Sequence, residues 1–258
     1  MIHAGWRDVV FLRECYTHPA AGVVLHKLSE FNVMDQLIKP EIFNGEVKAF
    51  FTRKSPGVNT GEISDLLSIP EQYIYMPVQK HTDRVLVLGS ELAPAMADAV
   101  ITQRKGILLG VRVADCVPIL LCDRKKSVVG AVHAGWRGTA SRIIRKTVRT
   151  MVELFGCSPK DIMAAIGPSV RWKCYDVGNE VRDAVCEATG EGNYCISKED
   201  KCFIDLSSAN RIQALSSGIP GENIWSSFEC TRCNPDRFHS YRYSRRYTGS
   251  QGGFIGVF

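Results

Sequence analysis

The sequence predicts an α+β protein, a single layered domain in which mixed β-sheets are flanked by helices. Its composition, with 45% hydrophobic and 23% charged residues, is that of a globular chain, since typical domains are about 45–50% apolar and about 25% charged. Two runs, 107–121 and 128–132, are apolar on both faces, as in strands buried inside a layered fold. A helical apolar stripe follows at 139–155. Strands interleaved with a few helices around one core are the expected result.

The strands are predicted from short apolar runs bounded by turn-forming residues. A turn-rich stretch, Lys54–Gly61, is predicted to be a long surface loop and not a domain boundary, because strand signals continue on both sides of it. One domain is therefore expected over residues 1–258, with the weakest pattern in 1–45. The predicted strands are Val23–Leu25, Val47–Thr52, Tyr73–Met76, Arg84–Leu88, Ala99–Thr102, Ile107–Val113, Val117–Leu121, Val128–His133 and Met163–Ile166.

One helix is predicted with defined ends. Thr139 is a suitable N-cap and Gly156 a suitable C-cap. The apolar stripe between them consists of Ile144, Val148, Met151, Val152 and Phe155. The opposite face carries Arg142, Arg145, Lys146 and Arg149, which we interpret as a solvated helix face in preference to a nucleic-acid footprint. Two further helices are predicted at Asn179–Ala188 and Leu206–Ser217.

Charge and hydropathy exclude several functional classes. The formal net charge is +5, from 32 Lys and Arg against 27 Asp and Glu, which permits an anionic small-molecule substrate but does not by itself indicate nucleic acid. No run approaches the roughly 18 apolar residues of a membrane span, and the N-terminal residues lack the pattern of a signal peptide. We therefore expect a cytoplasmic protein whose ten cysteines are mostly free, packed thiols.

Three segments place metal-capable side chains at the ends of strand-like runs. They contain His81, Cys116 and His133. Two imidazoles and one thiolate suit zinc or copper, and three protein ligands leave a coordination position open, as in catalytic zinc sites. The spacing alone does not show that the three residues meet, and a single histidine is more often a core or surface residue than a ligand.

Longer motifs around these residues resemble the YfiH, or laccase-domain, family. The central ones are Ala114-Asp115-Cys116-Val117-Pro118-Ile119-Leu120 and Ala131-Val132-His133-Ala134-Gly135-Trp136-Arg137-Gly138. The resemblance runs from about Phe51 to the C-terminus. Further matching segments, in the same order, are Gln79–His81 through Val85, Ala97–Thr102, Ile166–Pro168, Cys174–Gly178, Cys230-Thr231 with Cys233, and Phe238–Arg242.

The resemblance implies an αββα-like fold and a metal-binding triad at His81, Cys116 and His133. Members of the family are described as purine nucleoside phosphorylases with adenosine deaminase activity, as copper-dependent polyphenol oxidases and as a peptidoglycan-editing factor acting on cell-wall precursors. We expect Zn(II), which lowers the pKa of bound water from about 15.7 toward 7, with Cu(II) as the alternative. The expected substrates are a purine nucleoside (adenosine, inosine or guanosine) and phosphate. A multicopper site fits less well, because it needs a cluster of histidines and the chain has six in all.

Phosphorolysis also requires donors that hold phosphate, a task that suits the planar fork of arginine. The candidates are Arg53 in the early loop, Arg137 beside the third metal ligand and Arg242 in the C-terminal motif. Asp115 precedes Cys116 and is suited to orient a ligand or act as a base, and equally to form a buried structural hydrogen bond.

Some features depart from the family pattern or resemble other sites. A Thr-Thr-Arg-x-Gly-Gly-like segment is replaced here by Phe51–Gly57, and Tyr243 stands where a second arginine is usual. Cys230-x-x-Cys233 has no second CxxC partner, so we expect two thiols near a turn, with packing or support of the metal site as their role. The aromatic and basic segment Arg237–Tyr247 is interpreted as a pocket wall in preference to an RNA surface. His-Ala-Gly-Trp-Arg at 3–7 repeats 133–137 and is expected to be non-functional.

Overall fold

A computed structural model describes residues 36–198 and 201–258. Residues Gln36–Phe258 form one compact unit. The strand predicted at Val23–Leu25 and the copied pentapeptide at 3–7 lie outside the described residues, so both remain predictions. Within the described part of the chain, no helix has the length and apolarity needed to cross a membrane.

The first sheet has five strands in the order β1-β2-β14-β6-β3. Its centre is β14, which pairs antiparallel with β2 on one side and with β6 on the other. Consecutive glycines in β14 let the Phe51 ring and the Pro118 side chain approach Gly253 closely. The strands are β1 (Leu37–Ile38), β2 (Val47–Thr52), β3 (Ile74–Tyr75), β6 (Leu108–Val113) and β14 (Gln251–Val257).

The second sheet has six strands in the order β13-β9-β7-β8-β5-β4. Its central strands, β7 and β8, are buried along their whole length and pair antiparallel from Val117↔Ala134 to Asp123↔Val128. The strands are β4 (Val85–Val87), β5 (Ala99–Thr102), β7 (Val117–Asp123), β8 (Val128–Ala134), β9 (Ile162–Ile166) and β13 (Ile224–Ser226). The first and last pairs, β4 with β5 and β13 with β9, are parallel.

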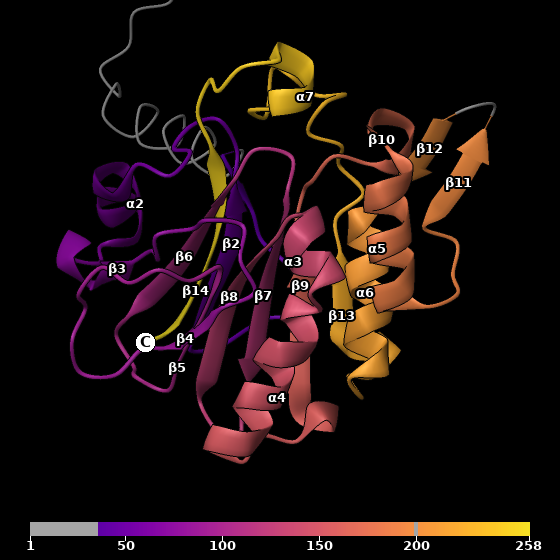
Figure 1. Cartoon of the computed structure of the whole chain (residues 1–258). Helices are drawn as coiled ribbons and strands as arrows, with labels where there is room; N and C mark the ends of the chain where they lie inside the picture. Colours follow the sequence, from indigo (N-terminus) through magenta and orange to yellow (C-terminus); the bar gives the residue numbers. More distant parts are fainter. Residues whose placement is uncertain (1–35, 199–200) are drawn as a thin grey trace, which may run out of the picture. The chain divides into compact units, whose positions relative to one another are not determined.

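The two sheets pack face to face, with helices on the outer face of each (Figure 1). Leu109 and Ile255 of the first sheet share a core cluster with Leu120 and Val129 of the second. Helix α2 (Thr60–Leu67) covers the outer face of the five-stranded sheet through Ile63. The outer face of the six-stranded sheet packs against α4 (Ile143–Phe155), α5 (Asn179–Thr189) and α6 (Leu206–Ser216). The αββα-like α+β architecture is confirmed.

The remaining elements are short. A three-stranded sheet has the order β10-β12-β11, formed by Asp176–Val177, Lys201–Ile204 and Cys195–Lys198. Two short helices are α3 (Trp136–Ala140) and α7 (Tyr241–Ser244). Four single 3₁₀ turns are η1 (Glu71–Tyr73), η2 (Pro159–Asp161), η3 (Trp172–Cys174) and η4 (Gly221–Asn223).

Eight of the predicted strands lie within the described residues, and all are confirmed with small shifts at their ends. The two strands predicted within the 107–121 run belong to different sheets and are joined by Ala114–Cys116. One correction concerns Lys54–Gly61, which was predicted to be a surface loop, since Pro56 and Gly57 are buried. Helix α2 begins at Thr60, and the Asn59 side chain caps it by accepting a hydrogen bond from the Glu62 N–H.

The predicted helix at 139–155 is wrong at its start. Thr139 is not an N-cap but lies buried inside α3, where its hydroxyl accepts a hydrogen bond from the Asn210 side chain (2.8 Å). The Gln213 side chain donates to the Thr139 carbonyl (3.0 Å). Arg142 breaks the helix at φ 59°, and its Nε donates to Ala188 O (3.1 Å). Contacts with α5 and α6 therefore divide the segment in two, whereas the Gly156 cap is confirmed at φ 63°.

Candidate active site

The candidate site lies where the chain passes from one sheet to the other. The connection Ala114–Cys116 joins β6 of the five-stranded sheet to β7 of the six-stranded sheet. The segment between β3 and β4, which contains His81, makes a second crossing between the same sheets. His133 lies near the end of β8, beside β7. The topology therefore brings three distant segments to one place.

Two of these residues are in or beside a strained backbone. Asp115 has φ 87° and His81 has φ 58°, in the left-handed region that non-glycine residues seldom adopt. The turn at Asp115 connects β6 to β7, and Cys116 directly precedes β7, whose first residue, Val117, pairs with Ala134 at the end of β8. Such conformations persist only where surrounding contacts enforce them, and they gather at functional sites.

Asp98 supplies the contacts that hold His81 and His133. Its Oδ1 accepts from the His81 backbone N–H (3.0 Å) and from His133 Nδ1 (2.8 Å). Its Oδ2 accepts from the Lys80 N–H (3.2 Å), the Thr82 N–H (2.7 Å) and the Thr82 hydroxyl (2.7 Å). This fully buried carboxylate therefore fixes the backbone around one imidazole and the ring of the other.

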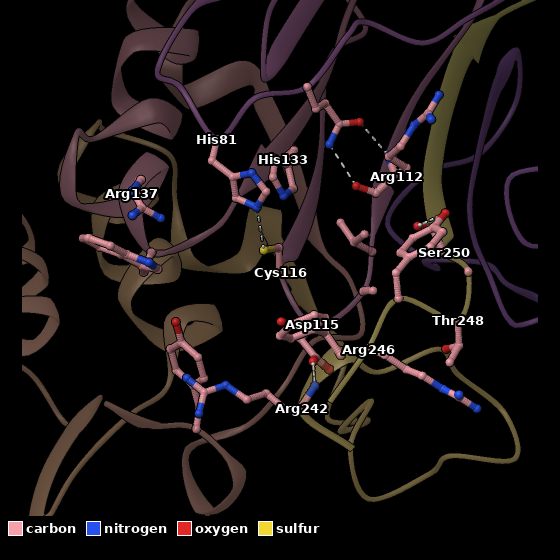
Figure 2. A pocket seen from close by; sticks show the side chains of 18 residues that line it. His81, Arg112, Asp115, Cys116, His133, Arg137, Arg242, Arg246, Thr248 and Ser250 are labelled. Atoms are coloured by element: carbon pink, nitrogen blue, oxygen red, sulfur yellow. Dashed lines mark hydrogen bonds between the residues drawn. The ribbon is translucent and has the colours of Figure 1, made fainter. Parts of the chain in front are cut away.

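The three predicted metal-capable side chains do meet. The ligand atoms of His81, Cys116 and His133 lie within 4.8 Å of one another, and Figure 2 shows the three side chains converging. Cys116 Sγ is 3.9 Å from His81 Nε2, and the imidazole rings are edge to face at 4.8 Å between centroids. Because Asp98 occupies His133 Nδ1, Nε2 is left to face the cluster, as in metal sites where a carboxylate orients a ligating histidine.

The electrostatics of the cluster favour a thiolate. Burial opposes it, but the charges and hydrogen bonds of His133 and His81 lower the pKa of Cys116 to about 6. Burial likewise opposes the charged form of His133, but the Cys116 thiolate and Asp98 raise the pKa of its imidazole to about 9. Hydrogen bonds from His133 and Thr82 outweigh burial and lower the pKa of Asp98. Without a metal, the site holds a thiolate beside an imidazolium and a carboxylate.

Gly135 allows the cluster to be this compact. A Cβ atom at this position would lie 3.0 Å from Cys116 Sγ and 3.2 Å from His81 Cδ2. A larger residue would therefore push against two of the three ligands at once. Gly135 directly follows β8 and is the N-cap residue of α3, the short helix that carries Arg137.

The triad lies in a pocket of about 520 Å³, within the usual range of roughly 300–1,000 Å³ for small-molecule sites. Among the described residues, four arginines line it, and Asp115 is the only carboxylate that does. Figure 2 shows Arg137 and Arg112 on opposite sides of the triad. The pocket is lined by Gln79, His81, Arg112, Val113, Ala114, Asp115, Cys116, His133, Trp136, Arg137, Tyr175, Tyr241, Arg242, Arg246, Tyr247, Thr248, Gly249 and Ser250.

Two of the three predicted arginines reach this pocket. The Arg137 guanidinium lies 4.3 Å from the Trp136 ring centroid, and that of Arg242 lies 4.6 Å from the Tyr175 ring centroid. Arg53, at the end of β2, is not among the described residues that line the pocket. The structure thus brings Arg137 and Arg242 to the triad, but not the Arg53 side chain.

Asp115 is held by the protein on both oxygens. Thr231 Oγ1 donates to Oδ1 (2.6 Å), and the backbone N–H of Arg242 donates to Oδ2 (2.7 Å). Its own carbonyl accepts from the Val170 N–H (3.0 Å). These bonds fasten α7 and two loops to the turn that carries Cys116. Of the two roles predicted for Asp115, the geometry favours the structural hydrogen bond.

Several pocket residues were not predicted from the sequence. The Gln79 side chain forms two hydrogen bonds with the backbone of Arg112 (2.8 and 2.9 Å). Arg112 is the one exposed position of β6, and a charge inside an apolar run was the signal for it. Asp98 and Tyr175 lay in quoted motifs but had no assigned role. Arg246 lies in the segment Arg237–Tyr247, which was interpreted as a pocket wall without a role for this residue.

Comparison with known proteins adds independent information. The family model described as multi-copper polyphenol oxidoreductase laccase matches residues 54–258. Adenosine deaminase RL5, from an unknown prokaryotic organism, is 36% identical over 200 residues, 72% of this chain and 74% of that protein. A purine nucleoside phosphorylase of Bacteroides thetaiotaomicron is 37% identical over 187 residues, 67% of this chain and 69% of that protein. The crystal structure of YlmD from Geobacillus stearothermophilus has a TM-score of 0.78 at 28% identity, covering 83% of this chain and 92% of that one.

Proposed function

Since the chain belongs to the YfiH, or laccase-domain, family, we propose that it is a metal-dependent purine nucleoside phosphorylase, with deamination of adenosine as a second activity. One observation carries the proposal: a His₂Cys cluster, four arginines and several aromatic rings line the same pocket. The names of the relatives, which include purine nucleoside phosphorylases and an adenosine deaminase, support the same substrate class.

The residues present fit a divalent metal. His81, Cys116 and His133 form a set of nitrogen and sulfur ligands with a low-pKa thiol, and Asp98 orients one imidazole. His81 is exposed, Cys116 is half-buried and His133 is buried. The cluster is therefore open to the pocket on the side of His81. We propose Zn(II), because such ligands in threes are typical of catalytic zinc. When bound, the ion supplies a Lewis acid to the pocket.

The arginines are suited to hold phosphate. Arg137 and Arg242 lie over aromatic rings, which limits the directions their guanidinium groups can take. Asp115 does not compete for them as a free carboxylate, because both of its oxygens already accept hydrogen bonds. A planar guanidinium binds two phosphate oxygens at once. Arg242 also forms an ion pair with Asp176 (3.4 Å), which offsets part of its charge, but the four arginines together still give the pocket an excess of positive charge for an anionic substrate.

The aromatic rings are suited to the purine base. Tyr241 and Tyr247 are 57% and 71% exposed, and they lie in the same pocket as Trp136 and Tyr175. Stacking on such rings is worth about 1–3 kcal/mol per base. Phosphorolysis forms a bond from a phosphate oxygen to C1′ of the ribose as the C1′–N9 bond breaks. The electron pair of that bond stays with the purine, which takes up the proton that the attacking hydrogen phosphate gives up, relayed by water at the open side.

The decisive experiment measures products. The purified chain, loaded with Zn(II), is incubated with adenosine, inosine or guanosine, with and without phosphate, and the products are separated by chromatography. Free base that appears only with phosphate supports phosphorolysis, and inosine formed from adenosine supports deamination. Cys116→Ala should abolish both, whereas Cys186→Ala, outside the pocket, should abolish neither.

Other outcomes would overturn the proposal. No turnover by the zinc-loaded chain, or full turnover by Cys116→Ala, contradicts it. Oxidation of a phenol by the copper-loaded chain, without nucleoside turnover, would favour the polyphenol oxidase alternative. Activity on cell-wall precursors alone would favour the editing alternative.

A further inference from the structure

A second cluster of metal-capable side chains lies outside the pocket lining. The sulfur atoms of Cys174, Cys230 and Cys233 lie within 4.8 Å of one another, and Cys174 and Cys233 are 3.2 Å apart. Cys174 ends η3, which follows β9, while Cys230 and Cys233 lie in the loop after β13. Two loops separated by 59 residues in sequence are therefore brought together through their thiols.

We propose that Cys174, Cys230 and Cys233 bind a second metal ion, a thiophilic d¹⁰ ion such as Zn(II) or Cu(I). Thiolate sulfur selects these ions over harder ones. A CxxC pair is a recurring part of structural metal sites, which usually have four ligands, and here it is joined by one distant cysteine. A fourth position at the exposed side of the cluster would be filled by water. The proposal concerns sites and residues separate from the pocket triad, so it does not depend on the proposed function.

The surroundings of the cluster support a metal site. Cys230 is buried, Cys174 half-buried and Cys233 exposed, so the cluster is fixed on one side and open to solvent on the other. The Arg171 backbone N–H points at Cys230 Sγ (3.4 Å), and peptide N–H groups stabilise ligating sulfur in this way. Cys230 is held in addition by a β-bridge to Ser169. One ligand is thus pre-positioned by the backbone, and the other two converge on it.

A disulfide is the main competing use of these thiols. A Cys174–Cys233 bond would use two sulfur atoms and leave the buried Cys230 thiol without a role in the cross-link. A metal ion uses all three. The positive charge of the ion would also offset the mutual repulsion of three adjacent thiolates.

The proposed ion would stiffen two walls of the pocket. Cys174 precedes Tyr175, whose ring lies beneath the Arg242 guanidinium. Cys230 precedes Thr231, whose hydroxyl donates to Asp115 (2.6 Å). Both segments therefore run directly from the thiol cluster to the pocket. We assign the second ion a structural role, in which it ties these segments together without touching substrate.

The test counts metal ions per chain. The full chain is purified under reducing conditions, saturated with Zn(II) and desalted, and its zinc is measured by plasma mass spectrometry. We expect about two zinc ions per chain for the wild type, about one for Cys233→Ser, about one for Cys116→Ser and almost none for the double variant. Cys186→Ser, a half-buried cysteine outside both clusters, serves as the matched control and should keep both ions.

A spectroscopic arm identifies the ligands. Co(II) bound by thiolates absorbs through sulfur-to-metal charge transfer, and the intensity increases with the number of thiolates. Cys116→Ser loaded with Co(II) should therefore keep the stronger part of this absorption, and Cys233→Ser should keep only the weaker part. Loading with Cu(I) in place of Zn(II), followed by competition between the two ions, shows which d¹⁰ ion the cluster prefers.

The possible failures are distinguishable. Equal zinc content in the wild type and in a folded Cys233→Ser variant overturns the second site, as does a Cys174–Cys233 disulfide that persists in reducing buffer. Cys174→Ser provides an independent variant if Cys233→Ser does not fold. Loss of an ion from Cys233→Ser but not from Cys116→Ser would leave the second site standing and contradict the pocket site.

Discussion

The two cysteine-containing clusters differ in the neighbours of their thiols. In the pocket, imidazoles flank Cys116 and lower its pKa to about 6 despite burial. In the second cluster, burial and the neighbouring Cys233 and Cys230 thiols raise the pKa of Cys174 to about 12. Within the same cluster, hydrogen bonds from backbone N–H groups lower the pKa of Cys230 despite its burial. Burial and the neighbouring groups together therefore decide which thiol is ionised before a metal binds.

The clusters also differ in how their backbones are held. The triad is carried on left-handed residues at His81 and Asp115, with a buried carboxylate bracing two ligands. The thiol cluster lies on a 3₁₀ turn and a loop, with one backbone hydrogen bond to sulfur. We interpret the first as a pre-organised centre and the second as a site that its ion completes.

The largest difference should appear in alkylation of the metal-free chain by iodoacetamide near neutral pH. Cys116 is mostly thiolate there, and although its low pKa reduces its nucleophilicity, it should react about 100-fold faster than Cys174. Its rate should fall as the pH is lowered through about 6. Peptide mass spectrometry measures both rates in one sample. Similar rates for the two thiols, or a Cys116 rate that does not change with pH, would contradict the contrast.

Asp98→Asn should weaken zinc binding in the pocket by about 10- to 100-fold, the usual cost of losing a carboxylate that orients a ligand. In asparagine an amide N–H₂ group replaces one carboxylate oxygen. This group cannot accept the hydrogen bonds that the backbone N–H groups and the Thr82 hydroxyl now donate to Asp98. Competition with a chromophoric chelator measures the affinity. Asp161→Asn, which removes a surface ion pair with Lys125, is the matched control. If Asp98→Asn binds zinc as tightly as the wild type does, the hydrogen bonds of Asp98 are not needed to position the ligands.

Gly135→Ala should weaken zinc binding in the pocket by about tenfold, because metal ligands must be held to within about 0.5 Å. The added methyl group would press on Cys116 and His81 while leaving the second cluster untouched. Gly89→Ala is the control, since a Cβ there meets nothing within 4 Å. Zinc titration of both variants is the measurement, and loss of both ions in Gly135→Ala would indicate general unfolding instead.

Arg242→Lys should have the smallest effect, raising KM for phosphate by about two- to fivefold, which corresponds to the loss of one hydrogen bond. Lysine keeps the charge and the backbone N–H that donates to Asp115, but loses the planar group over Tyr175. Steady-state kinetics at varied phosphate separates KM from kcat. Arg149→Lys, on the exposed face of α4, should leave KM unchanged. A fall in kcat alone would argue against phosphate binding by Arg242.

Local patterns predicted the strands well, because β5 to β9 are apolar runs with sharp ends. They could not show that 107–121 spans two sheets, since that depends on a left-handed turn at Asp115, a residue that seldom adopts this conformation. The break in the helix at Arg142 could not be predicted either, because it depends on contacts with helices that are distant in sequence. Strand β14 was missed because Gln-Gly-Gly-Phe-Ile-Gly-Val lacks the β-branched density of a typical strand.

The sequence was sufficient to predict the candidate metal-binding residues of the site, but not the residues that hold them in place. Motif resemblance placed His81, Cys116 and His133 together, and the structure brings their ligand atoms within 4.8 Å. Asp98 had no predicted role, because nothing in its own neighbourhood shows that two histidines will approach it. The third thiol of the second cluster was missed for a similar reason, since Cys174 lies 59 residues before Cys233. Sequence spacing does not reveal contacts that only the fold creates.

The central place of β14 in the five-stranded sheet has a consequence for biosynthesis. On the ribosome, β2 and β6 emerge long before β14. In the folded sheet, however, β14 lies between these two strands and pairs with both of them. The growing chain must keep two apolar strand edges apart until residues 251–257 arrive, and contacts of such long range slow folding. Thr248 and Ser250, which line the pocket, arrive with the same segment. The wall of the pocket that these residues form is therefore completed only after the last strand of the sheet has been synthesised.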